Sequence, residues 1–228
     1  MIELFSAITA FILSHAIPAV KPLRTYLIRA LGFKMYVAMY SAMSVGVLVW
    51  LGFAFSRAPF VEIWEFREWT RWVTVILMLP SCLLLVGGLF AANPLSLSLV
   101  ASDSFDPSRP GIVGVTRHPV IWAIGLWALA HIAPNGDLAS LSMFSLLLLA
   151  GLSGPKSLDG KHREKLGDEK WSALAVLTSS LPLLALLQGR TSLKGLRVWP
   201  LLAGVAVYAG LFVIHEWIIG IPPLPLIG

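Results

Sequence analysis

Long stretches of the chain carry almost no charge, and this feature limits the fold more than any other. Six stretches are predominantly apolar: 2–20, 35–55, 73–92, 118–133, 138–152 and 199–220. A transmembrane helix needs about 20 mostly apolar residues. The sequence therefore predicts an all-α fold, a polytopic membrane bundle of about six transmembrane helices. The fourth and fifth stretches are short, and the turn-like 134–137 predicts that they form a tight helical hairpin.

Composition excludes several other classes of protein. Hydrophobic residues make up 57% of the 228 residues and charged residues 13%, against about 25% charged in soluble domains. Mean hydropathy is +0.81. Cys82 is the one cysteine, so a disulfide framework or a cysteine-based metal site is excluded. No glycine-rich nucleotide-binding motif is present, which disfavours soluble nucleotide enzymes.

The positive charges predict how the chain is oriented. The net charge is +5, but the charges lie in loops between apolar stretches, so they indicate membrane topology rather than a nucleic-acid partner. Fourteen lysines and arginines fall in the first, third and fifth loops, and three in the others. The excess of positive charge predicts that those loops are cytoplasmic and that both termini are outside.

The fifth loop, 153–198, contains one further apolar segment. Residues 171–187 are apolar apart from a few hydroxyl side chains, and they include Pro182. Charge on both sides favours an interfacial or re-entrant helix. A seventh span remains the alternative. We expect one domain, 1–228, with this cytoplasmic loop as its largest polar part.

Histidines inside apolar stretches are the first candidates for function, because ionisable groups in the membrane are costly. His15 lies well inside the first stretch and His131 near the end of the fourth. Each either binds a metal or haem or makes a hydrogen bond to a facing carbonyl group. If His131 binds a metal, His15 and His215 are the available partners on other helices.

Arg117 and His118 precede Pro119, a residue suited to the first turn of a helix. A helix N-terminus attracts anions, so this pair is either an anion or cofactor contact or a charged anchor at the cytoplasmic end. His118 and His131 are thirteen residues apart, a rotation of about 220° and a rise of about 20 Å. They cannot bind one ion from the same helix.

Histidine ligands without thiolates in an apolar setting favour haem over zinc. A haem held by two histidines takes one from each of two helices and needs an apolar cage. Aromatic and methionine side chains suit such a cage, although they are usually packing residues. The candidates are Phe11, Met78, Trp122 and Trp127.

Several short motifs recur in an order that resembles the NnrU family of bacterial membrane proteins. They are Ser14-His15, Pro22-Leu23-Arg24, Tyr40-Ser41, Thr116-Arg117-His118-Pro119, Trp127 with Ala130-His131, Asn135-Gly136-Asp137, Asp159, Leu166-Gly167, Trp171, Thr178-Ser179 and Gly189-Arg190. The same motifs are similar to those of zeta-carotene isomerase, a membrane enzyme that contains haem b.

The resemblance implies particular site residues and a setting. It implies haem b as the cofactor, with His15 and His131 as its ligands, although Ala16 stands where the isomerase has serine. It leaves His118, with Arg117, as a residue near the cytoplasmic end. It further implies a multi-pass protein of the bacterial inner membrane, associated with nitric oxide and nitrite metabolism in denitrification. The bilayer and a nitrogen-oxide reductase or other membrane redox protein would be its partners.

Three alternatives follow from the same residues. Arg117-His118-Pro119 and the loop 164–171 resemble isoprenylcysteine carboxyl methyltransferases, which implies a membrane methyltransferase that uses S-adenosylmethionine. The resemblance to the isomerase implies cis-trans isomerisation of a carotenoid. A protein in which every buried histidine is merely hydrogen-bonded would be an assembly scaffold without catalysis.

Overall fold

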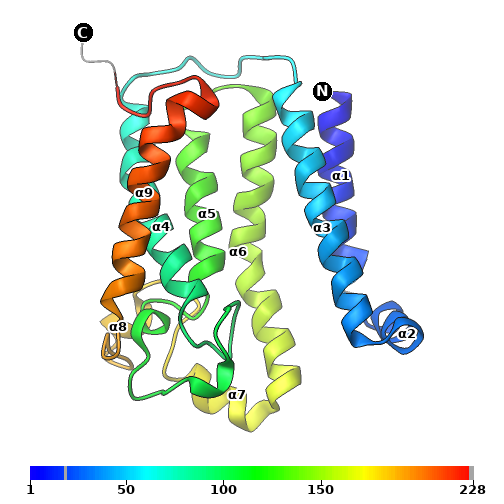
Figure 1. Ribbon diagram of the computed structural model, residues 1–228, viewed down its shortest axis with the longest axis vertical. Coiled ribbons are helices and arrows are strands. Elements are labelled where there is room, and N and C mark those ends of the chain that lie inside the picture. Colours follow the sequence, from blue (N-terminus) through cyan, green and yellow to red (C-terminus); the bar gives the residue numbers. More distant parts are fainter. Residues whose placement is uncertain (18–19, 226–228) are drawn as a thin grey trace. The chain divides into compact units, whose positions relative to one another are not determined.

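The protein is helical, as its apolar stretches predict. The computed structural model describes residues 1–17 and 20–225 (Figure 1). Among these residues the α-helices run in the order α1 (Ile2–Ala16), α2 (Lys21–Leu31), α3 (Phe33–Ser56), α4 (Thr70–Leu89), α5 (Pro119–Ile132), α6 (Leu138–Leu166), α7 (Asp168–Ala175), α8 (Leu184–Leu187) and α9 (Val198–Ile219). Two short 3₁₀ helices, η2 (Ser102–Ser104) and η3 (Gly111–Gly114), lie between α4 and α5.

A helix lies within each predicted apolar stretch, although residues 18–19 of the first stretch are outside the described residues, and a helical membrane bundle is confirmed. By length and composition, four helices in the described chain can cross a bilayer: α3, α4, α6 and α9. The bent pair α1 and α2 supplies a fifth if the two helices form one span. The helices lie at the predicted positions, but the predicted number of about six spans is not confirmed. The helix α1 has 15 residues and α5 has 14, which is shorter than a full span.

The fifth loop differs from its prediction at its first residues. The helix α6 does not end near residue 152 but continues through Pro155 to Leu166. Most residues beyond 155 are polar, but lysine, arginine, glutamate and leucine all favour helix. The helix therefore continues past the residue at which the apolar stretch ends. Residues 171–187 contain the end of α7, a turn and α8. They form no continuous helix and are not a seventh span.

The chain divides into two compact units. Unit 1 comprises residues 1–65 and 136–143, and unit 2 comprises residues 66–135 and 144–228, of which 66–135 and 144–225 are described. The helix α6 begins in the first and continues in the second.

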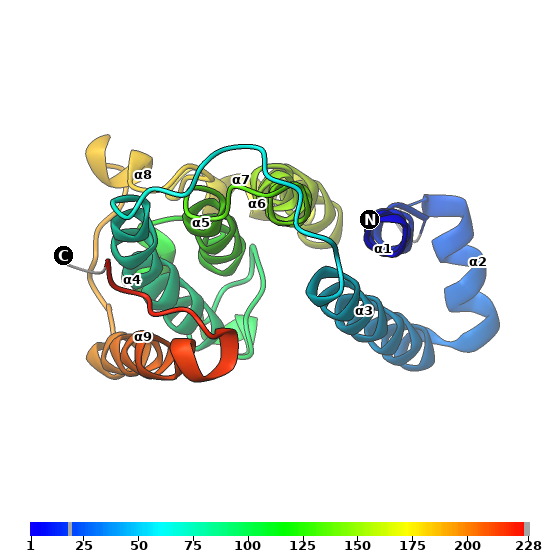
Figure 2. The ribbon, with the colours of Figure 1, turned by 90° about the horizontal axis from the view of Figure 1, so that it is seen from above.

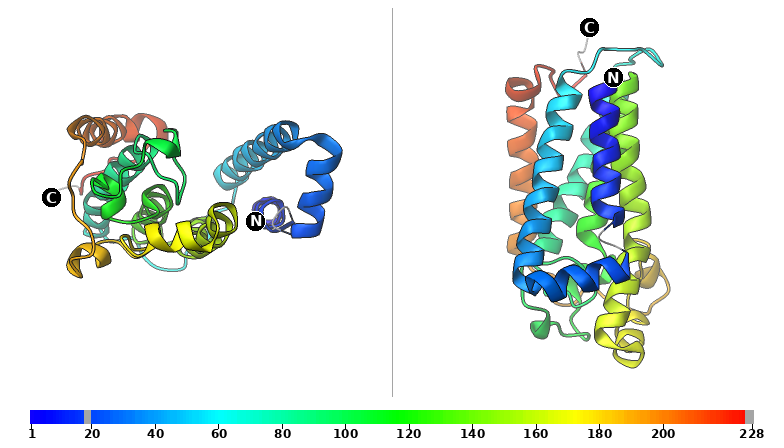
Figure 3. Two further views of the ribbon diagram at one scale, coloured as in Figure 1. Left: turned by 90° about the horizontal axis from the view of Figure 1, so that it is seen from below. Right: turned by 90° about the vertical axis from the view of Figure 1, so that its right-hand side faces the viewer.

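Unit 1 is built on the pair α1 and α3, and α2 packs against α3 (Figure 3). Leu4 and Ala7 of α1 and Leu51 and Ala54 of α3 are buried. The segment that follows α3 returns to the start of α6, where the backbone N–H of Leu138 donates to the carbonyl of Val61 at 2.8 Å. The N–H groups of Ile63 and Trp64 also donate to the carbonyl of Gly136, so the apolar contact and three backbone hydrogen bonds stabilise the unit.

Unit 2 is centred on α4, which packs against both α5 and α9 (Figure 2). Hydroxyl groups one heptad apart on α4 join it to α5: Thr74 donates to the carbonyl of Ala130 and Ser81 to that of Ala123, both at 2.7 Å. Tyr208 of α9 donates to the carbonyl of Val75 at 3.2 Å. Such bonds between helices have value in lipid, where the hydrophobic effect does not drive helices together.

The helices α5 and α6 approach closely at a pair of glycines. A Cβ atom on Gly151 would lie 2.8 Å from the Cα atom of Gly125. Only glycine permits this approach, as is common where membrane helices cross. This contact holds α6 against α5. It therefore also sets the positions of the α6 side chains before and after Gly151.

Candidate functional site

Arg117 occupies the turn that leads into α5. Its backbone N–H donates to the carbonyl of Ser179 at 2.7 Å, and its own carbonyl accepts from Nδ2 of Asn93 at 2.9 Å. Pro119 then begins α5, as predicted, with His118 as its N-cap. The arginine is thus tied to the loop after α4 and to the turn after α7 before its side chain makes any contact.

The Arg117 side chain is 8% exposed, and all of its nitrogens are bonded. Nη1 pairs with Oδ2 of Asp159 on α6 at 2.7 Å, and Nε donates to Oγ1 of Thr178 at 2.9 Å. Nη2 donates to the carbonyl of Ala175 at 2.8 Å. The guanidinium also lies over the ring of Trp171, 5.4 Å from its centroid. A buried charge is tolerated only with such complete pairing.

His118 is fully buried, with both ring nitrogens bonded. Nε2 lies 3.1 Å from Oδ1 of Asp159, and Nδ1 lies 2.9 Å from Oγ of Ser96. An ionised carboxylate only accepts, so Nε2 carries the proton, and Nδ1 accepts from the serine hydroxyl. Asp159 therefore joins Arg117 and His118 through its two oxygens. We call Ser96, Arg117, His118, Asp159 and Thr178 the polar cluster.

The polar cluster contains the serine–histidine–aspartate order of hydrolases, but it cannot act as one in this conformation. Ser96 is 6% exposed and His118 is 0% exposed, so no ester or amide can reach the serine oxygen. The second oxygen of Asp159 is also held by Arg117. The arrangement joins the turn before α5, α6 and the turn after α7, which is a structural role.

Two polar atoms beside the polar cluster have no hydrogen-bond partner among the described residues. They are Nε1 of Trp171 and Nδ1 of His162, and both are buried. The Trp171 ring also faces a second cation, since the Arg163 guanidinium lies 5.4 Å from its centroid. Trp171, from the loop 164–171 that resembles methyltransferases, therefore does contact Arg117, but the hydrogen-bonding groups of Arg117 and His118 are already occupied.

His131 has a different environment at the other end of α5. Its Nδ1 lies 2.7 Å from the carbonyl of Trp127, one turn earlier. A carbonyl only accepts, so Nδ1 carries the proton and Nε2 keeps its lone pair. Nε2 makes no hydrogen bond to any described residue. The rings of Trp127 and Phe144 lie 5.3 and 5.2 Å from the imidazole, centroid to centroid, and that of Phe144 is stacked.

His215, on α9, is the second histidine of this part of unit 2. Its Nδ1 lies 2.8 Å from the carbonyl of Ile221, so its Nε2 also keeps a lone pair. Histidines that bind a metal almost always donate the other N–H to a carbonyl or carboxylate, and both rings meet this condition.

His15 belongs to unit 1 and shows the same pattern. Its Nδ1 lies 2.8 Å from the carbonyl of Phe11, and the two rings are 4.3 Å apart. Nε2 lies 3.4 Å from the Ser44 hydroxyl, a weak contact, and Tyr40 approaches edge-on at 6.3 Å. His15 and His131 thus carry the same tautomer.

The structure places the remaining predicted residues as follows. Of the residues predicted for a haem cage, Phe11 contacts His15 and Trp127 contacts His131. Trp122 does not join them, because its indole N–H donates to the carbonyl of Ser180 beside the polar cluster, at 2.7 Å. Asp159 and Ser96 were not among the candidates. The one sequence feature that could have indicated Asp159 is its position as an acid just after the fifth apolar stretch. Its partners Arg117 and His118 lie more than 40 residues earlier in the chain, so the contact could not be inferred.

Comparison with known proteins identifies the family. A family profile described as NnrU protein matches residues 3–223. Searches of curated proteins and of solved structures found no significant match. The match covers both units and includes the motifs around His15, Arg117, His118 and His131. The chain therefore belongs to the NnrU family.

Proposed function

We propose that this membrane protein binds haem b through His131 and acts in nitric oxide and nitrite metabolism. The observation that supports the proposal most directly is the Nε2 atom of His131. It has a lone pair, it has no partner among the described residues, and an aromatic ring is stacked on its imidazole. Neutral imidazole nitrogen is a common protein ligand of haem iron.

The surrounding residues fit a haem better than a bare metal ion. Trp127 and Phe144 offer aromatic faces, and Trp127 also fixes the imidazole through its carbonyl. Within the described residues, no group of three or more histidine, cysteine or acidic side chains is arranged to hold a metal ion. A porphyrin supplies four of the iron ligands itself, so one or two histidines suffice.

The second axial ligand has two candidates. The resemblance assigns it to His15, whose Nδ1 is bonded in the same way. His215 is the other partner that the sequence left open; it is in unit 2 with His131, and its Nδ1 is likewise bonded to a carbonyl. Carbonyl bonds at Nδ1 hold each imidazole with Nε2 as the ligating atom and increase its basicity.

Haem bound at this position would supply reversible binding of nitric oxide or one-electron transfer. The chain's own part is to present Nε2 and to surround it with apolar side chains, which restrict water. The proposed setting is the inner membrane of a bacterium, with a nitrogen-oxide reductase or another membrane redox protein as the partner. Family membership and the partly buried His131 support this setting.

The absorption spectrum of the purified protein tests the proposal. Protein from haem-supplied cells should show a Soret band, which His131→Ala should abolish or shift. If both axial positions are histidine, His15→Ala or His215→Ala should convert a low-spin to a high-spin spectrum, which identifies the second ligand. Leu129→Ala, on the same helix, is the control and should leave the spectrum unchanged. Colourless wild-type protein would exclude haem binding.

One observation favours a second candidate, a methyltransferase that uses S-adenosylmethionine. Arg117 and Arg163 both face the ring of Trp171, whose indole N–H is buried without a partner. A ligand with an acceptor group would satisfy that N–H only after the turn around Trp171 opens, because the atom is shielded in this conformation. Calorimetry with S-adenosylmethionine tests this reading: saturable binding that Trp171→Phe weakens would support it, and the absence of heat change would exclude it.

A further inference from the structure

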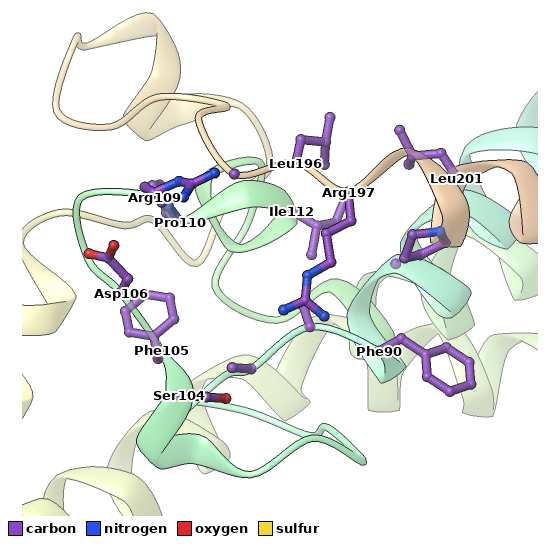
Figure 4. Close-up of a pocket in the computed structure, with 15 residues that line it drawn as sticks. Phe90, Ser104, Phe105, Asp106, Arg109, Pro110, Ile112, Leu196, Arg197 and Leu201 are labelled. Atoms are coloured by element: carbon purple, nitrogen blue, oxygen red, sulfur yellow. The ribbon is translucent and has the colours of Figure 1, made fainter.

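A cavity of about 420 Å³ lies in unit 2 at the ends of two spanning helices (Figure 4). Three segments line it: the end of α4 with the residues that follow it, residues 104–112, and residues 195–201 at the start of α9. Its volume falls within the range of small-molecule sites. The polar cluster and His131 are not part of its lining.

A tight backbone contact brings the lining segments together. The N–H of Gly111 donates to the carbonyl of Lys194 at 2.9 Å. Gly195 has a positive φ of 79°, and a Cβ atom there would lie 2.7 Å from the carbonyl oxygen of Arg109. Only glycine fits this position. The contact places Arg109 and Arg197, on different segments, at one cavity.

The cavity carries an excess of positive charge. The side chain of Arg197 has no ion pair or hydrogen bond to a described residue, and Figure 4 shows its guanidinium between Phe90 and Ser104, inside the lining. Asp106 is the one acid of the lining, and its carboxylate points away from Arg197. Ser108 bonds that carboxylate through its hydroxyl and its N–H, which lowers the pKa of Asp106.

The position of the cavity along the helices corresponds to the level of lipid headgroups. Phe90 directly follows α4, and Arg197 is the residue before α9. The rings of Phe90 and Trp199 are 5.1 Å apart, and aromatic residues concentrate at the membrane–water boundary. The loops at this end are those predicted to be cytoplasmic. Leu201 continues the lining onto α9, so the site is cationic at one side and apolar at the other.

From these features we infer that the cavity binds a phosphate group, held by Arg197 and Arg109. Arginine binds phosphate oxygens through paired N–H groups. Basic pockets at the cytoplasmic ends of membrane helices are suited to anionic headgroups. The apolar side, with Phe90 and Leu201, suits an acyl chain, so an anionic phospholipid is the phosphate source that the lining favours. A soluble phosphate would use the same arginines.

The experiment measures binding of phosphatidylglycerol to the full-length protein in detergent by native mass spectrometry. Arg197→Gln should weaken binding at least about tenfold, because it removes charged hydrogen bonds. Asp106→Asn should strengthen it, since one repelling charge is lost. Arg29→Gln removes an equal charge from an exposed site in α2 and is the matched control, with binding unchanged. Phosphatidylcholine and inorganic phosphate are tested in parallel.

Each result decides the inference. Preference for phosphatidylglycerol that Arg197→Gln removes and Arg29→Gln keeps, and that excess inorganic phosphate does not compete away, supports the lipid source. Binding of inorganic phosphate that Arg197→Gln removes supports the same site with a soluble source. Equal binding by wild type, Arg197→Gln and Arg29→Gln would overturn the inference, whatever the result of the haem experiment.

Discussion

The histidines at the two ends of α5 differ in how many of their ring nitrogens are hydrogen-bonded. At its N-terminal end, His118 is wholly buried and both ring nitrogens are bonded, to Ser96 and Asp159. Near its C-terminal end, His131 bonds only Nδ1, and Nε2 has no partner among the described residues. A satisfied buried group stabilises a fold, whereas a group left with a free lone pair can bind a ligand. The contrast supports a structural role for the polar cluster and agrees with the proposal that His131 binds a ligand.

The largest expected effect is on stability, from loss of the Arg117 charge. Arg117→Met leaves Asp159 without its ion pair, and breaking one partner of a buried pair costs about 3–5 kcal/mol. Denaturant unfolding in detergent should show this loss. The exposed pair of Arg57 and Glu3, 3.9 Å apart, provides the control, and Arg57→Ala should cost less than about 1 kcal/mol. Equal losses for the two variants would contradict the structural role of the polar cluster.

The next prediction tests whether the contact between α6 and α5 positions the α6 residues that lie against both histidines of α5. Gly151 lies on α6 between Phe144, which stacks on His131, and Asp159, which bonds His118. Gly151→Leu should force α6 from α5 and cost about 2–3 kcal/mol. It should also change the haem spectrum, unlike Leu129→Ala. A variant as stable as the wild type would show that the close approach at Gly125 is not required.

A smaller effect separates the two histidines. Ser96→Ala leaves the Nδ1 atom of His118 buried without a donor, which should cost about 1–2 kcal/mol. The haem spectrum should not change, because Ser96 belongs only to the polar cluster. Unfolding and absorption are measured on the same preparation. A shifted Soret band would show that His118, rather than His131, is near the haem.

The smallest effect on stability is expected at the aromatic neighbour of His131. Phe144→Leu keeps an apolar side chain but removes a ring stacked 5.2 Å from the imidazole, a loss of about 0.5–1.5 kcal/mol. The reduction midpoint of the haem should shift while its occupancy is kept. A midpoint equal to that of the wild type would remove Phe144 from the proposed site.

The apolar pattern predicts most of the fold and only part of the site. Lipid requires long apolar helices, so the six stretches could be found by counting, and Pro119 marked the start of α5. The end of α6 could not be found in this way, because its last turns are polar and helical at once. Trp127 lies one turn from His131, which makes their contact a local property of the helix.

Contacts between distant segments could not be predicted from one sequence. Asp159 becomes the partner of Arg117 and His118 only when α6 crosses α5 at its glycine pair. The occupied donors of Arg117 likewise depend on the turn after α7. The sequence identified Arg117, His118 and His131 as notable residues, but not which of them has a free nitrogen. That distinction depends on the packed structure.

The most direct test of the central claim is rescue of His131→Ala by imidazole. If Nε2 of His131 binds the haem iron, the variant should lose the wild-type Soret band and regain it when millimolar imidazole fills the space left by the side chain. Rescue also shows that the variant is folded. A wild-type spectrum in His131→Ala without imidazole, or a variant that is folded by circular dichroism and binds haem identically at every imidazole concentration, would contradict the claim.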